Sequence, residues 1–190
     1  MALHQRRMLN IVFTFLALIG FAVTGVTLWY FHKNNEFLTY KDQGDVGLSI
    51  RYPKTWTAAP YTNGTLVTFY SPLENSLDVF KENVNIVLQD MSEEKRALDL
   101  KQYTEIAINQ MQAVFKKNFV LLESKPTLMN GIPGHRIVFL AKGGESDLKV
   151  KCIWAIKAKR AYQFTYGALA SQYDKYVGQV DAMLRSIQIP

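Results

Sequence analysis

Residues 134–168, GHRIVFLAKGGESDLKVKCIWAIKAKRAYQFTYGA, contain three segments in which apolar side chains recur at every second position. This alternation is typical of β-strands. The segments span residues 134–142, 148–157 and 161–168, and short turns follow the first two, at Gly143-Gly144 and at residues 158–160. Because short turns join antiparallel neighbours, the stretch predicts three adjacent strands of an antiparallel sheet.

The same alternation predicts how these strands pair. A shift of one residue would move every apolar side chain to the other face, so we expect apolar residues to lie opposite one another. The expected pairs are Ile137 with Trp154, Phe139 with Cys152, Trp154 with Phe164, Ile156 with Tyr162, and Cys152 with Tyr166. These residues would form an aromatic face under one or both helices. The other face, which we expect to be only partly buried, receives Arg136, Lys149, Lys151, Val138, Leu140 and Ile153.

Further strands and two helices are predicted on both sides of this stretch. The strands are expected at residues 48–52, 65–70, 83–91 and 119–127, with turns at Asn63-Gly64 and Asn130-Gly131. A helical period begins at residue 100 and continues to 117, after a capping box formed by Asp99 and Gln102. Ser171 is the expected N-cap of the last helix. The residues therefore predict an α+β fold with an antiparallel β-sheet flanked by helices.

The N-terminal residues 8–31, MLNIVFTFLALIGFAVTGVTLWYF, hold no charged side chain. As a helix rising about 1.5 Å per residue, they would extend roughly 36 Å, enough to cross a hydrocarbon core of about 30 Å. Arg6 and Arg7 precede the stretch, while Trp29 and Tyr30 lie where aromatic residues settle at a membrane interface. We predict a single-pass signal-anchor helix with a cytoplasmic N-terminus and an extracytoplasmic, periplasmic or equivalent, C-terminal domain.

A cleaved secretory signal is the alternative, with a cut near residues 20–22. The apolar run continues to residue 31, well beyond the about 7–15 residues of a usual signal core, which favours an uncleaved anchor. Lipidation requires a cysteine directly after the apolar core, and the only cysteine is Cys152. The predicted organisation is a cytoplasmic N-terminus at 1–7, a transmembrane helix at 8–31, a tether at 32–46 and a folded domain at 47–190.

The composition is that of one domain with a mild positive charge. The chain has 22 Lys and Arg against 16 Asp and Glu, and its formal net charge is +6. The basic residues are spread along the chain without interleaved aromatic residues, so nothing favours nucleic-acid binding. A single cysteine excludes an internal disulfide.

Arg136, Lys149 and Lys151 form the one charged cluster that the sequence brings to a single sheet face. Such a cluster could dock an acidic partner or lipid headgroups, and a solvated basic face is its plainer interpretation. No catalytic set, metal-ligand set or cofactor motif appears, and Cys152 is interpreted as a small buried residue.

His135, Trp154 and Tyr162 are a second candidate site, because the expected register places them on the aromatic face. They could line a pocket for a small ligand or a metal ion. A lone histidine is more typical of a side chain hydrogen-bonded at the sheet edge.

Several segments, taken in order, resemble the PsbP-like family. They are residues 47–56 (GLSIRYPKTW), 67–72 (VTFYSP), 82–87 (ENVNIV), 131–134 (GIPG), 136–139 (RIVF), 161–166 (AYQFTY) and 184–187 (LRSI). The resemblance implies an α/β/α sandwich with helices on both sides of the antiparallel sheet. Family members include an extrinsic subunit of the photosystem II oxygen-evolving complex and cell-envelope proteins of the DcrB kind.

The resemblance implies a non-catalytic interaction domain. No position matches a calcium or manganese site of the family, so no metal site or cofactor is carried over. Our hypothesis is a membrane-anchored extracytoplasmic domain that binds or stabilises a membrane or envelope protein complex. The alternative is a PsbP-like domain that binds a small ligand or calcium, including a role related to the oxygen-evolving complex.

Overall fold

The computed structural model describes residues 36–78, 80–92, 98–143 and 146–190. In these residues the strands are β1 (Phe37–Lys41), β2 (Ser49–Pro53), β3 (Thr57–Pro60), β4 (Val67–Tyr70), β5 (Asn83–Asp90), β6 (Phe119–Met129), β7 (Ile132–Ala141), β8 (Leu148–Lys157) and β9 (Arg160–Leu169). The helices are α2 (Leu100–Phe115), the 3-10 turn η1 (Lys116–Asn118) and α3 (Tyr173–Ser186).

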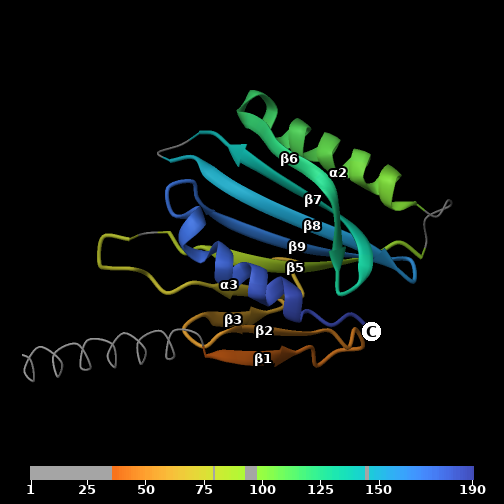
Figure 1. Ribbon diagram of the computed structural model, residues 1–190, viewed down its shortest axis with the longest axis horizontal. Coiled ribbons are helices and arrows are strands. Elements are labelled where there is room, and N and C mark those ends of the chain that lie inside the picture. Colours follow the sequence, from red (N-terminus) through yellow and green to blue (C-terminus); the bar gives the residue numbers. More distant parts are fainter. Residues whose placement is uncertain (1–35, 79, 93–97, 144–145) are drawn as a thin grey trace, which may run out of the picture. The chain divides into compact units, whose positions relative to one another are not determined.

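Seven of these strands form one antiparallel sheet in the order β3-β4-β5-β9-β8-β7-β6 (Figure 1). β1 and β2 form a separate pair. Strands β6, β7, β8 and β9 are consecutive in the chain and each pairs with the next. β9 also pairs with β5 on its other side. The sequence-based expectation of an antiparallel sheet built around residues 134–168 is confirmed.

Two tight turns lie where the sequence predicts turns, at Asn130-Gly131 and within residues 158–160. Asn130 and Gly131 have φ angles of 50° and 75°, and Ala158 and Lys159 have 50° and 59°. Two consecutive positive φ angles are the mark of the type I′ hairpin turn, which matches the twist of the flanking strands. Asn130-Gly131 is a favoured sequence for this turn, whereas Ala158 and Lys159 adopt positive φ angles that their residue types do not favour.

The register between β8 and β9 differs by one residue from the expected one. Trp154 lies opposite Gln163, not Phe164. The two-residue turn at Ala158-Lys159 sets this register, and it does not maximise apolar pairing across the strands. The expected pairs of Ile156 with Tyr162 and of Cys152 with Tyr166 are wrong for the same reason.

Between β7 and β8 the register differs by two residues. Ile137 lies opposite Cys152, and Phe139 lies opposite Val150. A shift of two residues leaves every side chain on the face that was expected, because side chains alternate with a period of two. Arg136, Lys149 and Lys151 therefore do share a face.

The two helices cover opposite faces of the sheet, since Lys151 and Trp154 project to opposite sides of β8. Trp154 Nε1 donates a hydrogen bond to Thr104 Oγ1 of α2 at 2.9 Å. Lys151 Nζ contacts Asp181 Oδ1 of α3 at 2.7 Å. Helices on both sides of an antiparallel sheet confirm the expected α+β architecture.

The face under α3 is more buried than expected. Ile153, Phe164 and Tyr166 are fully buried there. Tyr166 donates a hydrogen bond to the Tyr173 carbonyl at 2.9 Å, which ties β9 to the first turn of α3. The aromatic residues of β9 lie on this face because of the register, so α3 covers an aromatic layer.

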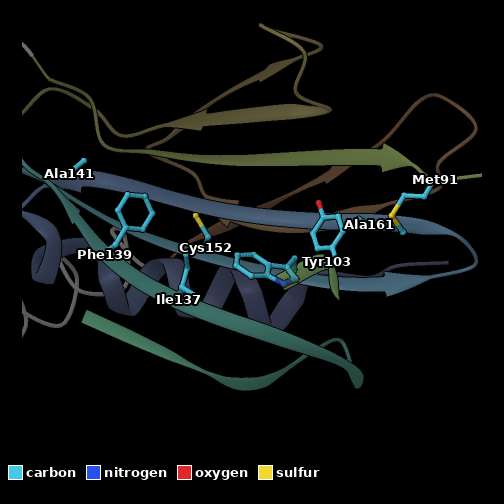
Figure 2. Packing of buried hydrophobic residues seen from close by; sticks show 8 residues of the cluster. Met91, Tyr103, Ile137, Phe139, Ala141, Cys152 and Ala161 are labelled. Carbon is cyan, nitrogen blue, oxygen red and sulfur yellow. The ribbon is translucent and has the colours of Figure 1, made fainter. Parts of the chain in front are cut away.

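The core on the α2 side is a second cluster of buried residues. Figure 2 shows Phe139 and Ala141 at one end of it, Met91 and Ala161 at the other, and Tyr103 of α2 between Cys152 and Ala161. The residues come from the end of β5, from α2 and from β7 to β9. This cluster joins α2 to the middle of the sheet.

The helix starts were predicted with mixed success. In α2, the Asp99 side chain accepts from the Gln102 N–H and the Gln102 side chain accepts from the Asp99 N–H, so the expected capping box is confirmed. α3 begins after Gln172, which makes no side-chain cap. The expected Ser171 cap is wrong, because the Gln172 N–H is bonded to the Leu169 carbonyl in the turn that precedes the helix.

The folded part begins before residue 47, where it was expected to begin. β1 lies within the predicted tether, and the Tyr40 ring meets Phe69 edge-on with centroids 6.0 Å apart. Tyr52 of β2 lies 4.8 Å from the same Phe69 ring. The β1–β2 pair is thus part of the packed domain and contacts β4.

The predicted transmembrane helix at 8–31 lies outside the described residues, as do Arg6, Arg7, Trp29 and Tyr30. Within the described ranges no helix is both long enough and apolar enough to cross a membrane.

Candidate functional site

Arg136, Lys149 and Lys151 lie together in one cleft of about 340 Å³ on the α3 side of the sheet. β7 supplies Arg136 and β8 supplies the two lysines, and Tyr173 of α3 closes one wall. The alternation of the strands predicts this grouping, and the structure brings the three cations together as expected. We call these residues the basic cleft.

Lys151 is the buried member of the basic cleft. Its side chain is only 5% exposed, and its ammonium lies 2.7 Å from the Asp181 carboxylate, which is 39% exposed. Burying a cation is unfavourable unless a counter-ion accompanies it, so Lys151 and Asp181 act as one structural unit. Lys151 joins α3 to the sheet and is poorly placed to meet a partner.

Arg136 is held by a carboxylate on the neighbouring strand. Its Nε donates to Glu123 Oε1 at 2.6 Å, and Lys125 approaches the other oxygen of the same carboxylate at 3.0 Å. The hydrogen bond from Arg136 holds the pKa of Glu123 below its ordinary value. This group therefore carries two positive charges against one negative charge.

Lys149 has the weakest counter-ion of the three cations. Its ammonium lies 4.1 Å from the centroid of the Tyr173 ring, a cation–π contact. Its carboxylate neighbour, Asp174, is 3.7 Å away and 86% exposed. An ion pair this exposed contributes about 0–1 kcal/mol, so an acidic group of a partner can replace Asp174 at little cost.

An apolar residue stands at the rim of the basic cleft. The register of β6 against β7 shifts between Leu121 and Glu123, so Leu122 has no partner in the ladder. Leu122 lines the cleft and is 51% exposed. The bulge thus places an exposed leucine beside three cations, a feature that no sequence pattern predicted.

The second candidate site, expected from His135, Trp154 and Tyr162, does not exist as a single pocket. Tyr162 lies opposite Ala155 and therefore projects to the α3 side, away from Trp154. The expectation is wrong because it depended on the register that the two-residue turn changes.

His135 and Trp154 do lie together on the α2 side. Their rings are stacked with centroids 5.8 Å apart, and a hydrogen bond of 2.8 Å joins His135 Nε2 to Ser124 Oγ of the edge strand β6. Burial lowers the pKa of His135 below its ordinary value. His135 is thus a histidine hydrogen-bonded next to the sheet edge, the plainer of the two interpretations.

A larger cleft, of about 410 Å³, lies between α2 and the sheet. We call it the α2 cleft. Its apolar wall includes Ala107, Met111 and Phe115 of α2, which face Trp154 of β8. Gln163 of β9 reaches the same cleft, because the observed register places it opposite Trp154.

Polar groups meet at one end of the α2 cleft. Gln163 Nε2 donates a hydrogen bond to the Tyr103 hydroxyl, which donates to Gln89 Oε1 at 3.0 Å. Burial raises the pKa of Tyr103, so this hydroxyl keeps its proton at neutral pH. Sequence reasoning missed this group because Gln89, Tyr103 and Gln163 are far apart in the chain.

Cys152 is 5% exposed, and burial raises its pKa from 9.0 to about 11. A protonated, buried thiol is a poor nucleophile. Among the residues with described positions, no group of three or more His, Cys, Asp and Glu could hold a metal ion.

The sequence model of the PsbP family matches residues 35–189. The chain belongs to the PsbP family. The match begins just before β1, in agreement with the early start of the folded part. No curated protein matches the chain in sequence.

Solved structures with the same fold come from several organisms. Cyanobacterial PsbP (CyanoP) from Synechocystis sp. PCC 6803 is 16% identical with a TM-score of 0.58, and the alignment covers 81% of this chain and 92% of that one. LpqN of Mycobacterium tuberculosis, involved in cell envelope biogenesis, is 11% identical with a TM-score of 0.59 over 85% and 95% of the chains.

The yeast Ran-binding protein Mog1p, from Saccharomyces cerevisiae, is 8% identical with a TM-score of 0.55 over 81% of this chain and 95% of that one. At these identities the likeness concerns the fold. The PsbP fold of this chain is thus shared by proteins with different described roles.

Proposed function

We propose that this PsbP-family chain is a non-catalytic interaction domain that docks on an acidic surface of a membrane or envelope protein through the basic cleft. The observation that carries the proposal is Lys149, a cation held by an aromatic ring and by one weak, exposed counter-ion. Leu122 beside it supplies an exposed apolar contact.

The composition of the basic cleft supports docking. Arg and Tyr are enriched at protein interfaces, and buried aromatic and Arg side chains carry much of the binding energy. In the cleft the Arg136 side chain is 26% exposed, Leu122 is exposed at the rim, and the buried Tyr173 ring forms part of the wall. An acidic group of the partner would meet Lys149 and Arg136, while an apolar side chain would meet Leu122.

The cell envelope is the proposed location. The apolar stretch at 8–31, with Arg6 and Arg7 before it, supports a single-pass anchor that holds the domain on the extracytoplasmic side. Protease treatment of intact spheroplasts should digest residues 32–190 and leave an N-terminal fragment. Full protection of the chain would contradict the proposed orientation.

Site-specific crosslinking tests the docking surface. A photoreactive amino acid at position 122 should give an adduct with one membrane or envelope protein in cells. The same amino acid at position 128, on the same strand β6 but outside the basic cleft, where Leu128 is 63% exposed, is the matched control and should not give that adduct.

Charge-reversal variants distinguish docking at the basic cleft from non-specific electrostatic attraction to the whole domain. Lys149→Glu should reduce the adduct by about fivefold or more, because it replaces an attraction with a repulsion worth about 1 kcal/mol. Lys101→Glu changes the net charge equally, at an exposed position of α2, and should leave the adduct unchanged. Equal loss in both variants, or adducts with lipid alone, would refute a specific protein partner.

A further inference from the structure

We propose that the α2 cleft binds an uncharged, mainly apolar small molecule that carries one carbonyl or hydroxyl group. This binding site is separate from the basic cleft, because the two lie on opposite faces of the sheet. The inference does not depend on the docking proposal.

The α2 cleft exists because α2 is held to the sheet at its two ends. Near its start, Thr104 accepts the hydrogen bond of the Trp154 indole at 2.9 Å. At its end, the Phe115 and Phe139 rings pack with centroids 5.6 Å apart. Between these contacts Ala107 faces the sheet with a single methyl group, so the space beneath the helix stays open.

The cleft has the size and the lining of a small-molecule site. Its volume of about 410 Å³ falls within the roughly 300–1,000 Å³ that is usual for such sites. Met111 and Phe115 of α2 and Trp154 of β8 form apolar walls. Methionine also adapts its shape to different apolar ligands.

The polar end of the cleft fixes the chemistry of the ligand. In the relay from Gln163 through Tyr103 to Gln89, each amide uses only one of its polar groups. Within the described chain, Gln163 Oε1 accepts no hydrogen bond and Gln89 Nε2 donates none. They offer one acceptor and one donor, which suit the hydroxyl or the carbonyl of a ligand.

Charge at the α2 cleft excludes ionised ligands. Among the described residues that line the cleft, none is Asp, Glu, Lys, Arg or His, although the chain holds 22 basic and 16 acidic side chains. A carboxylate or an ammonium placed there would lose its hydration without gaining a counter-ion. A neutral molecule loses only the hydration of one polar group, which the relay replaces.

Photolabelling of the full chain tests this proposal. The protein is reconstituted in phosphatidylcholine nanodiscs and labelled with a diazirine derivative of decanol, and the labelled peptides are identified by mass spectrometry. We expect saturable labelling of the tryptic peptide 102–116, which carries Ala107, Met111 and Phe115. Labelling of the apolar residues 8–31 serves as an internal reference for the probe concentration.

Competition tests the chemistry of the ligand in the unaltered protein. At pH about 8, where decanoate is ionised, unlabelled decanol should suppress the labelling of peptide 102–116 at least about tenfold more effectively than decanoate. Absence of saturable labelling would overturn the binding site. Equal competition by the two compounds would overturn the assignment of a neutral ligand.

Matched substitutions on α2 test the location. Ala107→Phe should fill the cleft and lower the labelling by about tenfold or more, because the added ring occupies the space of the ligand. Ala113→Phe adds the same ring at an exposed position of the same helix and should leave labelling unchanged. Ala107→Leu, a smaller filling, covers the case in which the Phe variant fails to fold. Unchanged labelling in a folded Ala107 variant would refute the site.

Discussion

The two helices lie on opposite faces of one sheet and are packed to different degrees. α3 buries Tyr173, Tyr176, Val180 and Met183, which form a continuous stripe against β9 and β2. α2 is longer, with 16 residues against 14, yet it buries only Tyr103 and Thr104. The helix with the larger potential contact area therefore has the smaller core.

The difference has a simple cause in the register. The turn at Ala158-Lys159 sends the aromatic residues of β9 to the α3 side and leaves Gln163 and Thr165 on the α2 side. α3 thus packs on aromatic rings, whereas α2 covers a mixed surface. One face is suited to hold the fold together, and the other has room for a ligand.

Truncation of one methionine on each helix tests this contrast most directly. Met183 is fully buried on α3, so Met183→Ala should lower the free energy of unfolding by about 2–5 kcal/mol. Met111 lines the α2 cleft and is only partly buried, so Met111→Ala should lower it by about 1 kcal/mol or less. Urea unfolding of both variants measures the difference. Equal losses would show that the two faces are equally packed.

Removal of the counter-ion of Lys151 should have the next largest effect. Asp181→Asn leaves a cation with a 5% exposed side chain beside a neutral amide. We expect a loss of about 1–3 kcal/mol, less than for a fully buried pair because Asp181 itself is 39% exposed. The double variant Lys151→Met/Asp181→Asn should recover most of this loss, since no charge remains buried. Failure to recover it would mean that packing at Lys151, not charge, is the dominant contribution.

Elements and turns could be predicted from the sequence because their signals are local. Asn130-Gly131 and the Asp99–Gln102 capping box each act within a few residues, and both are present. β1 was missed, because its sequence FLTYK is short and its apolar residues meet partners on β4 that are distant in the chain.

The grouping of site residues could be predicted only where the alternation of side chains along each strand was sufficient to place them on one face. Arg136, Lys149 and Lys151 stay on one face when the pairing of β7 with β8 shifts by an even number of residues. Their grouping was therefore predicted correctly although the register was not. The pocket with Tyr162 failed because it required the exact pairing of β8 with β9. Non-local partners, such as Asp181 for Lys151, depend on how a helix lies across the sheet, which no local pattern encodes.

The buried thiol on the α2 side predicts a change of stability at alkaline pH. Burial raises the pKa of Cys152 from 9.0 to about 11, so the folded state keeps the thiol protonated where the unfolded state ionises. The contribution of the protonated Cys152 thiol to the free energy of unfolding is fully present below pH 9. It is lost as the pH rises from 9 through about 11. Between pH 8 and pH 10 the wild type should lose about 1–2 kcal/mol relative to Cys152→Ala. Urea unfolding at both pH values measures it, and parallel behaviour of the two proteins would contradict burial of the thiol.

His135 gives the smallest expected effect, at the other end of the pH scale. Burial lowers its pKa, so the folded state favours the neutral ring, and the stability that depends on this ring is lost as the pH falls below the ordinary value of 6.5. The ring is stacked on Trp154 and bonded to Ser124, at the edge of the α2 side. In NMR titrations the ring protons of His135 should titrate below pH 6.5, and His135→Gln, which lacks their signals, confirms the assignment. A titration at or above 6.5 would mean that water reaches this ring freely, and that the α2 side is open at the sheet edge as well as beneath the helix.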